Sequence, residues 1–217
     1  MRKENRKNLY IAMGMLVAFV LWTVLICFVD VKAIGPRETF VGFATVNQWI
    51  HHLTGVHMSV YNITDWLGLV PIGFAIGFAL FGLIQWIQRR SIKKVDYSLF
   101  VLGGFYIVVM AAYVFFETVD VNYRPILING ALEASYPSST TMLVLCVMPT
   151  AIMQFHVRIK NGIFKRCVTV AMMIFIAFMV VGRLVSGVHW FTDIVGGALL
   201  SLGLVMLYRF VSQIKIK

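Results

Sequence analysis

The sequence GRLVSGVHWFTDIVGG, residues 182–197, places an arginine, a histidine and an aspartate between two apolar runs. Ionisable groups are costly inside a membrane, so such a cluster is a candidate functional site. His189 and Asp193 are four residues apart and would share one face of a helix that began near His189. The carboxylate could then accept the imidazole N–H, which would leave the other ring nitrogen free to attack an electrophile.

This stretch allows three interpretations. The His–Asp pair could be a satisfied polar contact between two helices. It could belong to a metal site, but no further cluster of His, Cys or Asp with ligand spacing accompanies it, and the three cysteines are scattered through apolar runs. Third, His189 could be a nucleophile that Asp193 orients, with Arg183 placed to bind an anion through two parallel hydrogen bonds.

The composition indicates an integral membrane protein. Hydrophobic residues make up 60% of the 217 residues, and the mean hydropathy is +0.85. A helix needs about 20 apolar residues to cross a bilayer, and none of the apolar runs shows the alternation typical of a β-barrel. Residues 1–217 are therefore expected to form a single all-α domain, a bundle of six transmembrane helices. The expected spans are 9–29, 66–87, 97–116, 138–155, 167–181 (extending to 185) and 191–211.

The basic residues predict how these helices are oriented. By the positive-inside rule, clusters of Lys and Arg next to membrane spans are cytoplasmic. Both termini are therefore expected inside the cell, and residues 182–197 near the outer surface of the plasma membrane. The net charge of +10 then reflects topology and does not indicate a nucleic-acid partner. The clusters are Arg2, Lys3, Arg6 and Lys7; Arg89, Arg90, Lys93 and Lys94; Arg158, Lys160, Lys165 and Arg166; and Arg209, Lys215 and Lys217.

The first outer loop, residues 34–65, is expected to contain a helix that lies on the membrane surface. This prediction rests on the approximately helical spacing of the apolar residues in the loop: Phe40, Phe43, Val46, Ile50 and Leu53. Its histidines, at positions 51, 52 and 57, lack ligand spacing and are expected to be ordinary interfacial residues. In the second span, Gly73 and Gly77 form a small-xxx-small pair, which is typical of close helix packing.

Two further polar segments lie on the same predicted side as His189. Arg124 is the only basic residue in the loop after the third span, and Pro125 ends regular structure directly after it. At the start of the fourth span, Pro137 is followed by the hydroxyl-bearing residues 138–141, which can cap a helix or present free N–H groups to an anion. Two arginines, a hydroxyl-rich helix start and a His–Asp pair together suit a phosphate monoester or a diphosphate.

The order and spacing of these residues resemble the type 2 phosphatidic acid phosphatase superfamily, relatives of the vanadium haloperoxidases. Its motifs run Lys-x6-Arg-Pro, Pro-Ser-Gly-His and Ser-Arg-x5-His-x3-Asp, and they correspond here to residues 117–125, 137–140 and 182–193. The resemblance implies the following roles: His189 as the nucleophile that forms a phosphohistidine, Asp193 as its orienting residue, Arg124 and Arg183 as phosphate ligands, and Ser138, Ser139 and nearby N–H groups as the rest of the phosphate site.

The chain departs from these motifs at four positions. Glu117 stands where the first motif has lysine, and Gly182 where the third has serine. Ser139 and Thr140 stand where the second motif has glycine and histidine. A carboxylate removes a positive contact to phosphate, and threonine cannot donate a proton near neutral pH. Glu117 could itself serve as the acid if the membrane interface held it protonated.

These observations predict a lipid phosphatase that acts at the outer leaflet of the cell membrane without a metal or other cofactor. Because a leaving phosphate needs a proton less than a leaving alkoxide does, a diphosphate such as undecaprenyl diphosphate is the favoured substrate. Two alternatives remain. One is a non-catalytic relative that binds lipid phosphates or a partner protein, and the other is a phosphotransferase that passes the group from His189 to an acceptor other than water.

Overall fold

The computed structural model describes residues 3–214, with side chains described from Asn5 onward. Within these residues, six helical segments are long and apolar enough to cross a membrane, which confirms the predicted all-α architecture. The second span begins earlier than predicted because a short helix, α3, runs directly into α4 at Gly68. The spanning helices are α1 (Lys3–Phe28), α3 with α4 (Met58–Leu67 and Leu69–Arg89), α5 (Tyr97–Thr118), α6 (Ser139–Arg158), α7 (Gly162–Val185) and α8 (Phe191–Ser212).

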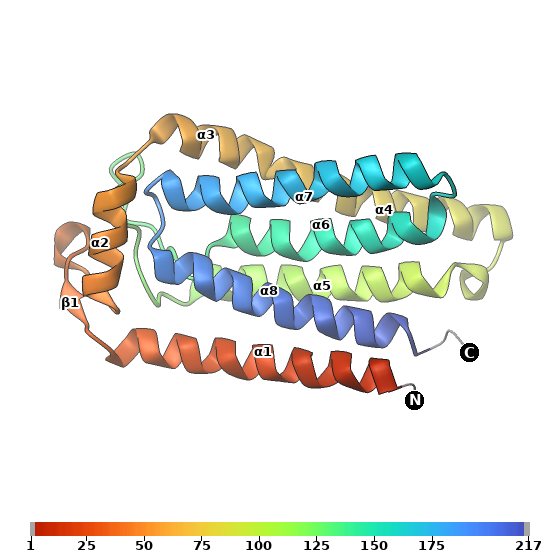
Figure 1. The fold of residues 1–217 in the computed structure, drawn as a ribbon, viewed down its shortest axis with the longest axis horizontal. Helices are drawn as coiled ribbons and strands as arrows, with labels where there is room; N and C mark the ends of the chain where they lie inside the picture. Colours follow the sequence, from red (N-terminus) through yellow and green to blue (C-terminus); the bar gives the residue numbers. More distant parts are fainter. Residues whose placement is uncertain (1–2, 215–217) are drawn as a thin grey trace.

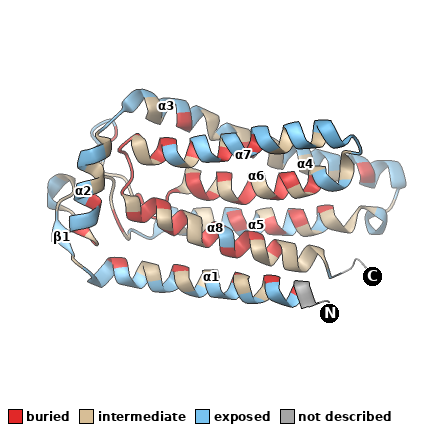
Figure 2. Ribbon diagram, viewed as in Figure 1, coloured by how far each residue is buried: buried red, intermediate tan, exposed pale blue. Residues whose placement is uncertain are grey.

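The spanning helices lie side by side, and the two chain termini lie at the same end of the bundle (Figure 1). Helix α8 packs against α1, α5 and α6, and α6 also contacts α4 and α7. Buried residues are concentrated along α6 and α8, while the other helices expose large apolar side chains (Figure 2). This pattern suits a bundle surrounded by lipid, since lipid-facing side chains need no aqueous contact.

The loop after α1 forms a small structure at the opposite end of the bundle. Strand β1 (Lys32–Ala33) pairs antiparallel with β2 (Phe40–Val41), and the 3-10 helix η1 (Pro36–Glu38) connects them. Helix α2 (Ala44–Thr54) then crosses this end of the bundle (Figure 1), which confirms that the loop between the first two spans contains a helix. We call this end of the molecule the α2 end. A second 3-10 helix, η2 (Ile92–Lys94), lies at the other end, between α4 and α5.

Helices α1 and α2 hold the first turn of α8 in place. The fully buried Asn47 of α2 donates from Nδ2 to the hydroxyl of Thr192 at 3.0 Å, and its Oδ1 accepts from the Thr192 N–H at 3.2 Å. From α1, the indole of Trp22 donates to the Thr192 carbonyl at 3.1 Å. The start of α8, which carries Asp193, is therefore fixed by side chains from two other helices.

Gly73 and Gly77 do not mediate close helix packing, so this prediction was wrong. A β-carbon at either glycine would meet no atom within 4 Å. Both glycines line an apolar groove of about 770 Å³ between α4, α6 and α7. The reason is that aromatic side chains fill the contact between α4 and α6, with Phe74 and Phe78 of α4 at 5.9 and 5.7 Å from the ring of Phe155.

The second and third basic clusters lie at the end of the bundle that carries the termini. They occupy the turns between α4 and α5 and between α6 and α7 (Figure 1). Arg2, Lys215 and Lys217 and the side chain of Lys3, which complete the terminal clusters, lie outside the described residues. The grouping of basic turns at one end is the arrangement that the positive-inside rule requires.

Candidate active site

The three motif regions meet at the α2 end of the bundle. They are the loop between α5 and α6, the first turn of α6, and the connection from α7 to α8 (Figure 1). His189 lies in the connection, two residues before α8 begins, and is almost completely buried. Arg183, in the last turn of α7, and Asp193, in the first turn of α8, are also buried.

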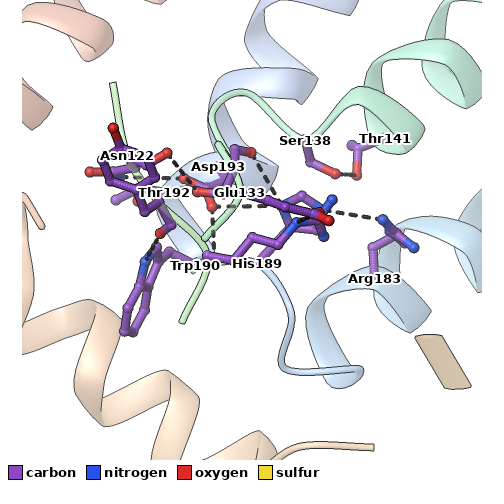
Figure 3. Close-up of polar contacts among 12 residues, drawn as sticks. Asn122, Glu133, Ser138, Thr141, Arg183, His189, Trp190, Thr192 and Asp193 are labelled. Carbon is purple, nitrogen blue, oxygen red and sulfur yellow. Dashed lines mark hydrogen bonds and ion pairs between the residues drawn. The ribbon is translucent and has the colours of Figure 1, made fainter. Parts of the chain in front are cut away.

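Two arginines converge on one nitrogen atom of His189. Its Nε2 lies 3.2 Å from Nη2 of Arg183 (Figure 3). The same nitrogen lies 3.4 Å from Nη1 of Arg124. Guanidinium groups can only donate, so Nε2 is the accepting nitrogen and the ring proton is on Nδ1. The Nδ1–H donates to the carbonyl of Ser135 at 3.2 Å. The Nε2 electron pair therefore faces two cationic side chains.

The surroundings of His189 favour its neutral form. Burial, followed by the positive charges of Arg124 and Arg183, holds the pKa of His189 well below its usual range. Both effects disfavour a second proton on the ring. The imidazole is therefore neutral near pH 7, which is the form that can act as a nucleophile.

Asp193 does not accept the hydrogen bond that the sequence predicted. Because α8 begins only at Phe191, His189 is not on a helical face with Asp193, and Nδ1 lies 3.7 Å from Oδ2. Instead, Oδ2 accepts from the N–H of Trp190 at 2.9 Å, and Oδ1 accepts from the Asn122 amide at 3.4 Å (Figure 3). The carboxylate thus caps α8 and places a negative charge beside Nδ1.

The two arginines come from different segments and have different partners. Nη1 of Arg183 lies 3.5 Å from the hydroxyl of Thr64 and 3.6 Å from Oδ1 of Asp65, both on α3. Arg124 forms an ion pair from Nε to Oε2 of Glu133 at 2.9 Å, and its backbone N–H donates to the Glu133 carbonyl at 3.0 Å. Both arginines therefore reach His189 from fixed positions, as candidate phosphate ligands.

At the start of α6, the two serines have different environments. Ser138 is fully buried; its N–H donates to the Asp193 carbonyl at 3.1 Å, and its hydroxyl accepts from Thr141 at 3.0 Å. Ser138 therefore joins α6 to α8. Ser139 instead lines a small cavity that Glu117, Arg124 and His189 also line. In the first helical turn, the N–H groups have no intrahelical acceptor, so those near Ser139 are available to an anion.

The cavity beside His189 has a volume of about 20 Å³, which suits a single water molecule. Glu117 lies in its wall, as do Arg124 and Ser139, so the residue that replaces the motif lysine borders the same space as two of the candidate phosphate-binding residues. Thr140 is oriented differently: its methyl group lies 3.6 Å from where a β-carbon on Gly68 would be. Across residues 5–214, no group of three His, Cys, Asp or Glu side chains is arranged to hold a metal ion.

The packing of α3 explains why the third motif has Gly182 in place of serine. A β-carbon at Gly182 would lie 2.8 Å from the methyl group of Thr64. The hydroxyl of Thr64 donates to the carbonyls of Val60 and Tyr61, and a β-branched side chain in a helix has little rotamer freedom. A side chain at Gly182 would therefore push α3 away from Arg183.

The α2–α3 connection packs on the segment directly before His189. The N–H of His57 donates to the carbonyl of Ser186 at 3.0 Å, and Nε2 of His51 lies 3.1 Å from the carbonyl of Gly187. Gly187 has a φ of +68°, and a β-carbon there would meet the Gly55 carbonyl at 2.1 Å. Only glycine fits this position, because the conformation and the close backbone contact both exclude a side chain.

Several contacts at the candidate site could be predicted from the sequence only weakly or not at all. Ser135 acts through its backbone carbonyl, which every residue possesses. Asn122 lies two positions before Arg124, inside the first motif segment, so its amide could have been suspected as a polar group near the site. Thr64 and Asp65 are far from Arg183 in the sequence, and only the packing of α3 on α7 brings them together.

Comparison with known proteins agrees with the motifs. Residues 115–216 match the model of the PAP2 superfamily. A solved structure, described as the first transmembrane PAP2-type phosphatidylglycerolphosphate phosphatase from Bacillus subtilis, shares the fold with a TM-score of 0.57 and 19% identity. The alignment covers 96% of this chain and 98% of the other. A search of the curated proteins finds no match. Residues 115–216, which include the three motif regions gathered around His189, are thus similar to the PAP2 superfamily.

Proposed function

We propose that the protein is a phosphatase that hydrolyses lipid phosphates or diphosphates through a covalent intermediate on His189. The convergence of Arg124 and Arg183 on Nε2, while Ser135 keeps the proton on Nδ1, carries this proposal. A phosphate bound by the two guanidinium groups would bring its phosphorus next to the free electron pair of the ring. The arginines would also stabilise the charge of the transferring group.

The reaction proceeds in two displacements. In the first, the Nε2 electron pair forms a bond to phosphorus, and the bond from phosphorus to the leaving oxygen breaks, so that its electrons stay on that oxygen. The ring becomes positively charged, and the Asp193 carboxylate, 3.7 Å from Nδ1, stabilises it. In the second, water adds to phosphorus, the P–N bond breaks, the electron pair returns to Nε2, and the proton of the water leaves with the phosphate.

The substrate class follows from the missing acid. Thr140 cannot supply a proton, so an alkoxide leaving group is disfavoured, whereas a phosphate leaves without one. This favours a polyprenyl diphosphate such as undecaprenyl diphosphate over a monoester such as phosphatidic acid. The apolar surface of the surrounding helices supports a lipid as the rest of the substrate.

The orientation belongs to the same proposal: the active site faces the outside of the cell, and both termini are cytoplasmic. The basic turns at the end opposite His189 support it. Labelling of single cysteines in intact cells tests it, with Cys27 and Cys167 replaced by serine because both are exposed. A cysteine at Asn129 should react with an impermeant reagent and one at Lys93 should not; the reverse result contradicts the orientation.

Glu117 supports a second candidate, a non-catalytic relative that binds lipid phosphates. An acidic residue borders the cavity where the motif has a lysine. The loss of this positive charge should reduce turnover more than it reduces phosphate binding by the two arginines. Release of phosphate from a panel of lipid phosphates and diphosphates by the purified protein, with a metal chelator present, separates the candidates. His52→Ala, at an exposed histidine, is the control for His189→Ala. If wild type and His189→Ala release phosphate equally, the enzyme proposal fails.

A further inference from the structure

The aromatic ring of Tyr61, on α3, faces both arginines of the candidate phosphate site. Its centroid lies 5.0 Å from Cζ of Arg183 and 6.0 Å from Cζ of Arg124. Both distances are within the range of about 6 Å over which a guanidinium is attracted to the face of an aromatic ring. Tyr61 lies outside the three motif regions. Among the described residues of α3, it is the one aromatic side chain that contacts the two arginines.

The site needs such a contact before a phosphate arrives. Arg124 and Arg183 both donate to the same nitrogen of His189, so two positive charges are close together in a buried place. Glu133 offsets the charge of Arg124, and Asp65 lies near Arg183, but each carboxylate serves one arginine. The ring of Tyr61 contacts both, and so can hold them in one arrangement.

The buried position of Arg183 makes the aromatic contact more important. Its Nε has no hydrogen-bond partner among the described residues, although the side chain is almost fully buried. A cation that is removed from water gains more from an aromatic face than an exposed cation does. The Tyr61 ring therefore replaces part of the hydration that Arg183 loses.

Helix α3 fixes the ring relative to the site. The Tyr61 carbonyl accepts from the Thr64 hydroxyl at 3.0 Å, and Thr64 packs directly on Gly182, next to Arg183. At the start of α3, the N–H of His57 donates to the carbonyl of Ser186. The ring is thus held by contacts to α7 and to the segment before His189.

We propose that Tyr61 is a positioning residue of the phosphate site, whose ring holds Arg124 and Arg183 in the arrangement that binds the phosphate. This inference rests on the proposed function, because it concerns the same site. The ring, not the hydroxyl, carries the effect. Tyr61→Phe therefore keeps phosphate binding, and Tyr61→Leu, which replaces the ring with an aliphatic side chain, weakens it.

The test measures inorganic phosphate and vanadate binding to the purified protein, together with KM and kcat for the best lipid substrate. Tyr61→Leu should weaken anion binding and raise KM by about 5- to 30-fold, the range expected for two buried cation–π contacts, with a smaller change in kcat. Tyr61→Phe should stay within about 2-fold of wild type. Trp66→Leu, on the lipid-exposed face of the same helix, is the control and should change neither.

The inference would be overturned by an absence of phosphate or vanadate binding in the wild type, by unchanged binding in Tyr61→Leu, or by equal loss in Tyr61→Phe and Tyr61→Leu. A lower melting temperature of Tyr61→Leu with unchanged anion affinity and KM would show a purely structural role and also overturn it. Because anion binding needs no turnover, the two proposals can fail separately. Tyr61-dependent binding without hydrolysis contradicts the phosphatase alone, and hydrolysis that is unaffected in Tyr61→Leu contradicts the Tyr61 inference alone.

Discussion

The backbone carbonyl of Ser135 accepts the hydrogen bond from Nδ1 of His189 at 3.2 Å, and so fixes the tautomer of the candidate nucleophile. A side-chain substitution cannot remove this acceptor. Asp193, 3.7 Å from the same nitrogen, contributes charge and caps α8. The orientation of the ring and the stabilisation of its positive charge are therefore provided by two different groups.

For this reason, Asp193→Asn should keep part of the activity. Asparagine can still accept from the Trp190 N–H, and Ser135 still orients the ring, so only the negative charge beside the phosphohistidine is lost. We expect kcat to fall by about 10²- to 10³-fold, the usual effect of losing one group that stabilises charge in the transition state, whereas His189→Ala falls to background. If Asp193→Asn is folded but as inactive as His189→Ala, Asp193 and not Ser135 orients the ring.

Restoring the motif serine should damage the protein. Gly182→Ser brings a β-carbon to 2.8 Å from the methyl group of Thr64, and overpacking of this kind costs about 1–3 kcal/mol. The melting temperature and the phosphate affinity should both fall. Thr64→Ser removes that methyl group and keeps the hydroxyl near Arg183, so the double variant should recover both properties. A Gly182→Ser protein as stable and active as wild type would contradict this account of α3.

The substrate preference tests the role of the missing acid. General acid catalysis contributes about 10²–10⁴-fold, so the wild type should hydrolyse a polyprenyl diphosphate faster than phosphatidic acid by a factor in this range. Thr140→His, which restores the histidine of the second motif, should raise monoester turnover more than diphosphate turnover.

Glu117→Gln is tested in the same two assays, hydrolysis of a polyprenyl diphosphate and hydrolysis of phosphatidic acid. It removes a negative charge from the cavity wall and should lower KM for both substrates without changing their ratio. Equal turnover of both substrates by the wild type, together with a selective loss of monoester turnover in Glu117→Gln, would show that Glu117 is the proton donor.

The lowered pKa of His189 predicts the acidic side of the pH profile. Because the neutral ring attacks, activity is lost only as the pH falls through the pKa of His189 in the folded protein, which lies below its usual value of about 6.5. kcat/KM, which reports the free enzyme, should therefore stay high down to pH values below 6.5. The profile is measured with two substrates whose phosphate groups have different pKa values. A decline caused by ionisation of the substrate differs between them, whereas one caused by His189 is the same for both. A shared decline that begins above pH 6.5 would contradict the prediction.

The sequence predicted the helices well because a membrane span leaves a long apolar run that needs no tertiary information. It also predicted that Arg124, Arg183 and His189 lie together, since each is an ionisable group beside an apolar run. The two side chains do lie close together, but the hydrogen bond from His189 to Asp193 was mispredicted, because α8 begins after His189 and the ring N–H turns to the Ser135 carbonyl. The role of Tyr61 depends on how α3 packs on α7, and no local pattern encodes that contact.

The most direct test of the phosphohistidine mechanism is to trap the intermediate. The purified protein is mixed with a polyprenyl diphosphate that carries a radioactive terminal phosphate, and the reaction is stopped in alkali within the first turnover. The account predicts an acid-labile, alkali-stable label on a peptide that contains His189, and no label in His189→Ala. Steady release of phosphate by the wild type without label on His189, or with equal release by His189→Ala, would contradict it.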